Sequence, residues 1–316
     1  MDEIIKILKE AETVAICPHI SEDADCIGSS LAMKCALSHM GKKADIYISA
    51  PLEARLDFLN ADAIIYEGDA KEYDVCLCLD CGDIKRLGAR IELFEKAKIT
   101  ASVDHHMTNT HFAEYNYVEA DASATGEILC RMIENMGVVI DAEIAGYLFT
   151  AIASDTGSFK YSNVSPATLR ETAKLLEKGI DNAYISRMLF DTMDENYMRF
   201  EGHLMNCIKT YYGGKLAVLV VTNNDIKSYG IDPTATGDTV NIARKVAGSE
   251  IAVSIREMDD KIKMSFRSNE DADVSRIAAE FGGGGHMKAS GASVELMELD
   301  KLLEKVVKAC GEILNG

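Results

Sequence analysis

The chain has 316 residues, of which 47% are hydrophobic and 27% charged, a balance typical of a soluble globular protein long enough for two domains. Its net charge of −18 argues against a long nucleic acid as partner, because such a protein needs a basic groove, but it permits a small phosphorylated substrate held by local cations. No apolar run is long enough to span a membrane, and residues 1–12 have an amphipathic, acidic pattern unlike a signal peptide. We therefore expect a cytoplasmic protein with no membrane partner.

Apolar runs alternate with helical patterns through the first 190 residues. Strands are predicted over 13–17, 44–48, 63–66, 74–79 and 99–103. Helices are predicted over 26–40, 83–95, 123–136, 141–154, 166–178 and 182–190. The strands are apolar almost throughout, as expected of strands covered on both faces, so the pattern predicts a parallel sheet between helices.

The pattern changes after about residue 194. A helix leading into a strand is predicted over the fragment DENYMRFEGHLMNCIKTYY. Further strands are predicted over 215–222, 250–258 and 261–268, and helices over 237–247, 273–280 and 296–314. We therefore predict an α/β protein with a first domain at 1–190, a linker helix at 191–211 and a smaller α/β domain at 212–316.

The nine cysteines are odd in number and scattered along the chain, which indicates reduced thiols. The fragment CLCLDC at 76–81 suggests a metal site at first sight. However, Cys76 and Cys78 alternate with apolar residues, as small buried residues of a strand do. We therefore place these thiols in the core.

Acidic and histidine side chains follow several predicted strands and one helix. They are His19, Asp23 and Asp25 after the first strand, Asp80 after the fourth, Asp104, His105 and His106 after the fifth, and Asp155 after the helix over 141–154. A lone aspartate in such a place is commonly a helix cap or a turn residue, and a lone histidine is commonly a surface or core residue. Because the carboxyl ends of parallel strands converge on one crevice, we expect these segments to meet.

Carboxylates together with imidazoles favour a borderline divalent ion such as Mn²⁺, whereas Mg²⁺ prefers oxygen ligands alone. The candidate ligands exceed what one ion needs, so two ions that share a carboxylate fit better. A pair of this kind clamps the attacking and leaving oxygens in phosphate ester hydrolysis and lowers the pKa of water. The pattern therefore indicates a two-metal phosphoesterase.

Six ordered motifs carry a resemblance to a known family. HISEDADCIGSS, LDCGD, SVDHHMTN and ASDTGSF resemble the four motifs of the DHH phosphoesterases, and SFRS and FGGGGHMKASG resemble the DHH-associated domain. The resemblance spans nearly the whole chain. Its length and layout are similar to the group of bacterial nanoRNases and pAp phosphatases, which implies an active site in the cleft between the two domains.

The resemblance implies two divalent ions, most simply Mn²⁺, with Mg²⁺ or Co²⁺ as alternatives. The first ion would be held by His19, Asp23 and Asp80, and the second by Asp25, Asp80, His105 and Asp155. Asp80 then bridges the ions and is catalytic, and His106 is a catalytic residue that faces the scissile phosphate. Asp104 orients a histidine instead of binding an ion.

The glycine run at 282–285 is either a flexible linker or an anion-binding loop. Glycines let backbone N–H groups approach a phosphate, and Arg267 has the planar fork that grips one. By resemblance, the substrate-binding residues are Arg267, Ser268, Gly283, Gly284, Gly285, His286, Lys288 and Ser290. The segment from Lys288 to Gly291 is expected to be turn-like.

The predicted reaction is hydrolysis of short oligoribonucleotides such as pApA to mononucleotides, of pAp to AMP, or of both. A homodimer is implied by resemblance. The alternatives are an inorganic pyrophosphatase of the same family and a catalytically silent nucleotide-binding module. An exonuclease acting on long single strands is disfavoured by the charge. One residue departs from the family pattern, since Glu22 stands where proline usually precedes the first aspartate, and its role is left open between a solvated side chain and a neighbour of the metal ligands.

Overall fold

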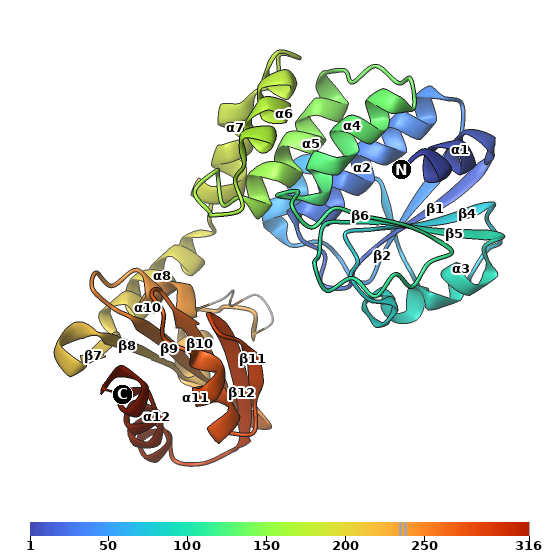
Figure 1. Ribbon diagram of the computed structural model, residues 1–316. Helices are drawn as coiled ribbons and strands as arrows, with labels where there is room; N and C mark the ends of the chain where they lie inside the picture. The colour runs from blue at the N-terminus through green and yellow to red at the C-terminus, as the bar shows by residue number, and fades with distance from the viewer. Residues whose placement is uncertain (234–235, 237–238, 316) are drawn as a thin grey trace. The chain divides into compact units, whose positions relative to one another are not determined.

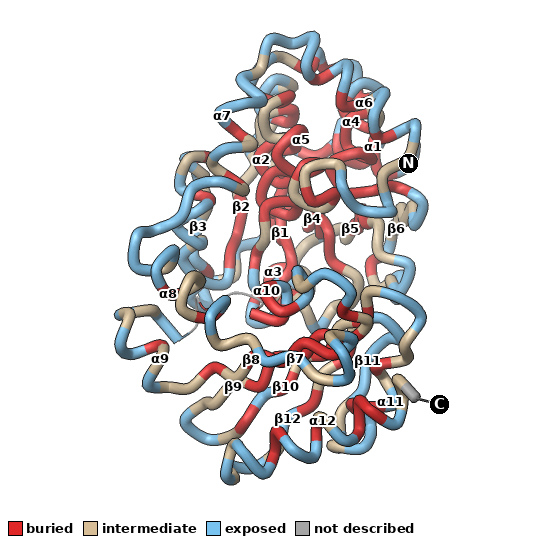
Figure 2. Tube along the Cα trace, turned by 90° about the vertical axis from the view of Figure 1, so that its left-hand side faces the viewer, coloured by how far each residue is buried: buried red, intermediate tan, exposed pale blue. Residues whose placement is uncertain are grey.

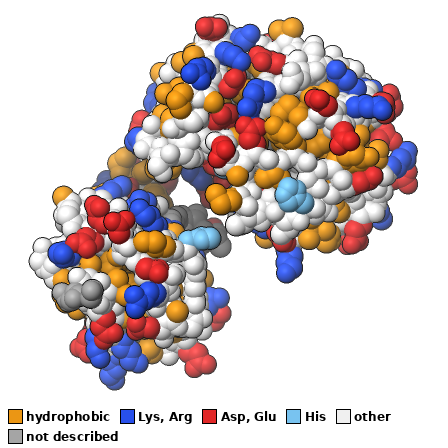
Figure 3. All heavy atoms as spheres, viewed as in Figure 1, with side chains coloured by type: hydrophobic (Ala, Val, Ile, Leu, Met, Phe, Trp, Pro, Cys, Tyr) orange, Lys and Arg blue, Asp and Glu red, His pale blue; other side chains and the backbone are white. Residues whose placement is uncertain are grey.

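The computed structural model describes residues 1–233, 236 and 239–315. The chain divides into two compact units, Met1–Thr192 and Met193–Gly316, which are described separately (Figure 1). Among the described residues, no helix is both long and apolar enough to cross a membrane. On the face seen in Figure 3, acidic and basic side chains are interspersed over both units.

The first unit contains a parallel sheet whose strands, within the described residues, run in the order β3-β2-β1-β4-β5-β6. The strands are β1 Thr13–Pro18, β2 Lys43–Ile48, β3 Ala63–Ile65, β4 Val75–Leu79, β5 Ile99–Asp104 and β6 Tyr115–Val118. The five predicted strands are confirmed, and the predicted α/β class with them. The edge strand β6 was not predicted because its sequence YNYV is only half-buried and lacks an apolar run.

Helices cover both faces of this sheet. The regular helices are α1 Asp2–Glu10, α2 Ala24–His39, α3 Ile91–Lys96, α4 Thr125–Asn135, α5 Ala142–Asp155, α6 Pro166–Leu176 and α7 Asn182–Ser186, with a 3₁₀ helix η1 at Ala54–Leu59. Figure 1 shows α1, α2, α4 and α5 on one face and α3 on the other. The central strands β1 and β4 and the helices α2 and α5 are the most deeply buried parts (Figure 2), and both thiols Cys76 and Cys78 are fully buried as predicted.

Two predicted helices are divided in the structure. The helix expected over 83–95 is a 3₁₀ helix, η2 Ile84–Arg90, followed by α3, because Gly88 adopts φ 58° and ψ −136°. That conformation is strained for any residue with a Cβ. The helix expected over 182–190 continues from α7 into a π-helical turn, η3 Arg187–Asp191.

The second unit has a mixed sheet in the order β11-β12-β10-β9-β8-β7 within the described part of the chain, in which only β8 and β9 are paired in parallel. Its strands are β7 Lys209–Tyr211, β8 Leu216–Val221, β9 Ile251–Glu257, β10 Lys261–Ser268, β11 Gly284–His286 and β12 Ala289–Glu295. Its helices are α8 Glu195–Asn206, α9 Asn223–Ser228, α10 Val240–Arg244, α11 Val274–Glu280 and α12 Leu299–Asn315, with a 3₁₀ turn η4 at Tyr212–Gly214. The predicted linking helix corresponds to α8, which buries Phe200 and Leu204 in this unit.

Two sequence expectations for this unit need correction, and one helix was missed. The helix expected over 237–247 is the shorter α10, and residues 237 and 238 lie outside the described part. Helix α9 was not predicted. The glycine run enters strand β11, and Ser290 and Gly291 belong to strand β12 instead of a turn, because β11 and β12 form a hairpin whose turn holds Met287 and Lys288.

Candidate metal centre

The predicted acidic and histidine residues of the first unit meet at the carboxyl ends of its strands. His19 follows β1, Asp80 follows β4, and Asp104 is the last residue of β5. Asp23 caps the N-terminus of α2 by accepting a hydrogen bond from the backbone N–H of Cys26. The sheet topology therefore brings together the sequence-distant segments that the strand-end rule predicted.

His19, Asp23 and Asp80 form one group, called the first position below. The Nε2 atom of His19 lies 3.4 Å from Oδ2 of Asp23 and 3.5 Å from Oδ2 of Asp80. The thiol of Cys26 also borders this group, but burial, with Asp23 and Asp80 adding to it, raises the pKa of that thiol well above its usual value. A protonated thiol is a poor ligand, so the imidazole and the two carboxylates are the donors suited to a cation.

Asp25, His105 and Asp155 form a second group around Asp80, called the second position. The Nε2 atom of His105 lies 3.3 Å from Asp155 Oδ2, 3.4 Å from Asp80 Oδ1 and 3.9 Å from Asp25 Oδ2. This Nε2 atom is buried and has no hydrogen-bond partner in the described structure. A buried nitrogen surrounded by carboxylate oxygens beyond hydrogen-bonding geometry fits a divalent cation placed among them.

The negative field of the carboxylates shifts the histidines strongly. Burial opposes their charge, but the contacts of His19 with Asp23 and Asp80 raise its pKa to about 10. Burial likewise opposes the charge on His105, yet Asp155, Asp25 and Asp80 raise its pKa to about 10. His19 and His105 therefore hold a proton near neutral pH when no metal is bound. A metal ion that bound to these imidazoles would displace that proton.

Asp25 is fully buried and is held by three donors. Its Oδ1 accepts from the hydroxyl of Ser29 at 3.0 Å and from the N–H of Gly126 at 3.0 Å, and its Oδ2 accepts from the N–H of Thr125 at 2.8 Å. The Thr125 hydroxyl also donates to Asp80 Oδ1 at 3.0 Å. Thr125 therefore orients two carboxylates at once, a role that the sequence analysis missed because only its place at the start of a predicted helix was visible.

The backbone of Asp80 adopts a left-handed conformation with φ 56°. Aspartate tolerates this region better than most residues, but it remains uncommon outside glycine. The Asp80 N–H donates to the carbonyl of Val103 at 3.1 Å, which anchors the turn to β5. In this conformation the carboxylate of Asp80 lies beside His19 and His105 and accepts a hydrogen bond from the Thr125 hydroxyl.

Asp104 is bonded to the last histidine of its motif. Its Oδ1 lies 2.7 Å from Nδ1 of His106, and its Oδ2 accepts from the side-chain amide of Asn109 at 2.7 Å. Asp104 raises the pKa of His106 despite burial. Nδ1 of His106 also lies 3.6 Å from Oδ1 of Asp80. This geometry is consistent with the predicted orienting role of Asp104.

In the second unit, the predicted substrate residues differ in exposure. Ser268 and Ser290 are buried, and their hydroxyls donate to the backbone carbonyls of Glu270 and Val274. Gly284, Gly285, His286 and Lys288 are exposed. The glycines have a packing reason as well, since a Cβ on Gly283 would lie 2.1 Å from the carbonyl of Gly291. Arg267 donates from Nη1 to the carbonyl of Phe266 at 3.1 Å.

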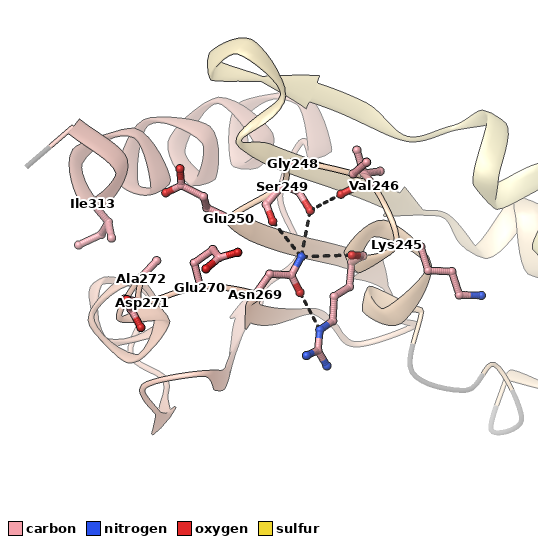
Figure 4. Close-up of a pocket in the computed structure, with 12 residues that line it drawn as sticks. Lys245, Val246, Gly248, Ser249, Glu250, Asn269, Glu270, Asp271, Ala272 and Ile313 are labelled. Carbon is pink, nitrogen blue, oxygen red and sulfur yellow. Dashed lines mark hydrogen bonds between the residues drawn. The ribbon is translucent and has the colours of Figure 1, made fainter. Parts of the chain in front are cut away.

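A pocket of about 890 Å³ opens beside the start of β9 and the end of β10, lined by residues 244–250 and 269–272 and by Ile313 (Figure 4). Asn269 organises it, because its amide donates to Ser249 and to the carbonyl of Arg244 and its Oδ1 accepts from Arg244 Nε. None of the predicted substrate-binding residues lines this pocket, so it is separate from the glycine hairpin.

Comparison with known families gives the class of the chain. Residues 13–152 match the DHH family, N-terminal domain, and residues 213–312 match the DHHA1 domain. The chain therefore belongs to the DHH family, and the family resemblance drawn from its motifs is confirmed.

The chain is similar to several named members. It is 31% identical to the bifunctional oligoribonuclease and PAP phosphatase NrnA of Thermus thermophilus, over 99% of this chain and 94% of that protein. The protein of that name from Bacillus subtilis is 22% identical over 98% of both chains. Among solved structures, an exopolyphosphatase-related protein from Bacteroides fragilis is 26% identical, has a TM-score of 0.87 and covers 99% of this chain and 95% of its own.

Proposed function

We propose that this protein is a two-metal phosphoesterase that hydrolyses short oligoribonucleotides to mononucleotides, pAp to AMP, or both. The observation that carries the proposal is the buried, unpartnered Nε2 of His105 among the carboxylates of Asp25, Asp80 and Asp155. The 31% identity to an oligoribonuclease and PAP phosphatase over nearly the whole chain supports the substrate class.

The first position would hold one ion through His19, Asp23 and Asp80, and the second would hold another through Asp25, Asp80, His105 and Asp155. Mn²⁺ suits this mixture of carboxylates and imidazoles, with Mg²⁺ or Co²⁺ as alternatives. When bound, the ions supply Lewis acidity toward the phosphoryl oxygens and make water nucleophilic near neutral pH.

The protein's own residues orient the substrate and the metal ligands for the reaction. In the hydrolysis, water adds to phosphorus, the P–O bond to the departing nucleoside oxygen breaks, and that oxygen takes up a proton. His106, held by Asp104, places Nε2 for a hydrogen bond to a phosphoryl oxygen as negative charge builds there. Thr125 keeps Asp25 and Asp80 in fixed orientations throughout.

The second unit would bind the rest of the substrate. We assign this role to the exposed hairpin residues Gly284, Gly285, His286 and Lys288 together with Arg267, whereas Ser268 and Ser290 support the hairpin through their buried hydroxyls. Backbone N–H groups of glycine segments and cationic side chains suit a phosphate or a nucleotide. We further propose that the protein acts as a homodimer in the cytoplasm, where its nine free thiols would stay reduced.

The test is an assay of the purified protein with Mn²⁺ against pAp, pApA, a five-nucleotide RNA and pyrophosphate. We expect turnover of pAp or of the short RNAs and little turnover of pyrophosphate. Preferred turnover of pyrophosphate would instead support the family's inorganic pyrophosphatase activity. Absence of both metal binding and hydrolysis would indicate a silent nucleotide-binding module.

A further inference from the structure

Glu22 lies inside the segment that carries the first-position ligands, between His19 and Asp23, yet its side chain is only 4% exposed. Its Oε1 accepts from the backbone N–H of Ser49 at 2.6 Å, and its Oε2 accepts from the Ser49 hydroxyl at 2.8 Å. The guanidinium of Arg90 donates from Nη1 to Oε1 at 2.8 Å. Glu22 is therefore neither a solvated side chain nor a free carboxylate beside the candidate ligands.

Arg90 is the other half of this contact, and its side chain is 1% exposed. Its Nε donates to the carbonyl of Leu87 at 3.0 Å, and its Nη1 also donates to the carbonyl of Tyr47 at 2.8 Å. A buried charge is costly unless it is paired and hydrogen-bonded. Glu22 and Arg90 are paired with each other and hydrogen-bonded through Nε and Nη1, and Nη2 is the one guanidinium nitrogen with no partner among the described residues. The pair therefore ties the segment of Glu22 to the end of β2 and to η2.

Helix η2 contacts the same segment at two more points. The N–H of Ile20 donates to the carbonyl of Arg86 at 2.7 Å, and Nη2 of Arg86 lies 3.0 Å from Nδ1 of His19. Gly88 permits the close approach, because a Cβ at that position would lie 2.9 Å from Cγ2 of Ile20. Since η2 begins four residues after Asp80, it links the loop of the shared carboxylate to the loop of His19.

We infer that Glu22 and Arg90 are positioning residues that set the geometry of the first position and leave the second position largely independent. This assignment rests on the two-ion centre of the proposed function. The second position has separate supports, since Ser29, Thr125 and Gly126 hold Asp25 without contact to the Glu22–Arg90 pair. Loss of the pair should therefore lower the affinity for an ion at the first position and leave the affinity at the second position unchanged.

The experiment is a titration of the metal-free full-length protein with Mn²⁺, followed by calorimetry and by electron paramagnetic resonance, which separates paired from single Mn²⁺. His19→Ala and His105→Ala define the signatures of losing the first and the second ion. We expect wild type to bind two ions, and Glu22→Gln to bind the first ion about 10–100-fold more weakly, with a signature like that of His19→Ala. The second ion should bind with unchanged affinity.

A double variant separates positioning from simple support of the fold. Replacing both buried charges, as in Glu22→Leu with Arg90→Met, should recover much of the thermal stability lost in either single variant. We expect its first position to remain weak. Asp225→Asn in the second unit is the control, because it loses bonds to Thr222 and His203 far from the ligands in sequence and should leave both ions in place.

Three outcomes would overturn the inference. Unchanged affinities for both ions in Glu22→Gln and in the double variant would show that the pair does not set the first position. An equal loss of Mn²⁺ affinity at both positions would show that the pair does not act on the first position alone. A wild-type protein that binds no Mn²⁺ would overturn the two-ion centre itself, and the assignment with it.

Discussion

Strand β4 has an aspartate at each end, and the two differ in almost every physical respect. Asp74 precedes the strand, is 28% exposed at its side chain, and accepts from the N–H groups of Glu12 and Thr13 and from Lys98. Asp80 follows the strand, is buried with φ 56°, and lies within 4 Å of three imidazoles. The carboxylate at the entrance of the strand is stabilised by its donors, whereas the exit crowds several carboxylates and imidazoles together.

Ionisation also differs between Asp74 and Asp25, a carboxylate that lies near Asp80. Lys98 and the backbone N–H groups lower the pKa of Asp74 well below its usual range. At the other end, burial and the charges of Asp80 and Asp155 raise the pKa of Asp25. A lowered pKa marks a site that stabilises the charged form of its carboxylate, and a raised one marks a site that destabilises it. The unfavourable end is where function is expected.

The largest expected effect comes from removing the shared carboxylate. Asp80→Ala should lower kcat/KM by roughly 1,000-fold or more, because both ions would lose a ligand that they share. Steady-state kinetics with the preferred nucleotide and Mn²⁺ measures this. The matched control is Asp74→Asn at the other end of β4, which should keep wild-type kcat/KM. Wild-type activity in Asp80→Ala would refute the two-ion centre.

The next effect concerns a residue that binds no ion. Thr125→Val removes the hydroxyl that donates to Asp80 while it keeps the shape and the backbone N–H that holds Asp25. We expect Mn²⁺ affinity and activity to fall about 10–100-fold. Thr125→Ser retains the hydroxyl and should behave like wild type. If valine and serine at this position gave the same Mn²⁺ affinity, orientation of Asp80 by Thr125 would be excluded.

A third test asks whether the crowded carboxylates beyond the end of β4 lower the stability of the metal-free protein. Burial and Asp80 raise the pKa of Asp155, so Asp155→Asn should relieve repulsion in the metal-free protein. We expect a gain of about 1 kcal/mol in the free energy of unfolding, or about 2–4 °C in Tm for a unit of this size. Thermal unfolding in EDTA and then in Mn²⁺ measures it, and wild type should gain more stability from Mn²⁺ at micromolar concentration than the variant, which lacks a ligand of the second position. A lower Tm for the variant in EDTA would contradict the predicted repulsion.

The difference between the two ends also explains what the sequence could and could not predict. The sequence predicted the meeting of Asp80 and His105 because both follow apolar strands, whose carboxyl ends share one edge of a parallel sheet, and it added Asp155 because that residue follows an apolar helix. Thr125 and the Glu22–Arg90 pair were out of reach. The bond from Thr125 to Asp25 joins positions 100 residues apart, and that from Arg90 to Glu22 joins positions 68 apart. No local periodicity encodes such contacts, because they arise only when the layers pack.

The smallest expected effect concerns Asp74, before the start of β4, and the pH dependence of the free energy of unfolding. Asp74→Asn removes the charge that attracts Lys98 and the backbone N–H groups, and should lower the free energy of unfolding by about 0.5–1 kcal/mol at pH 7. The pKa of Asp74 is lower in the folded protein than its ordinary value of 3.8. Its stabilisation is therefore complete above about pH 4 and is lost as the pH falls through the folded pKa.

Denaturant unfolding of wild type and Asp74→Asn at several pH values between 7 and 2.5 measures this dependence. The two unfolding free energies should differ by a constant amount down to about pH 4 and converge below it, because a protonated Asp74 resembles the amide. A difference that grew as the pH fell would mean that the folded protein favours the neutral carboxyl. In that case Asp74 would resemble Asp25 and Asp155, whose charged forms are disfavoured, and the contrast between the two ends of β4 would fail.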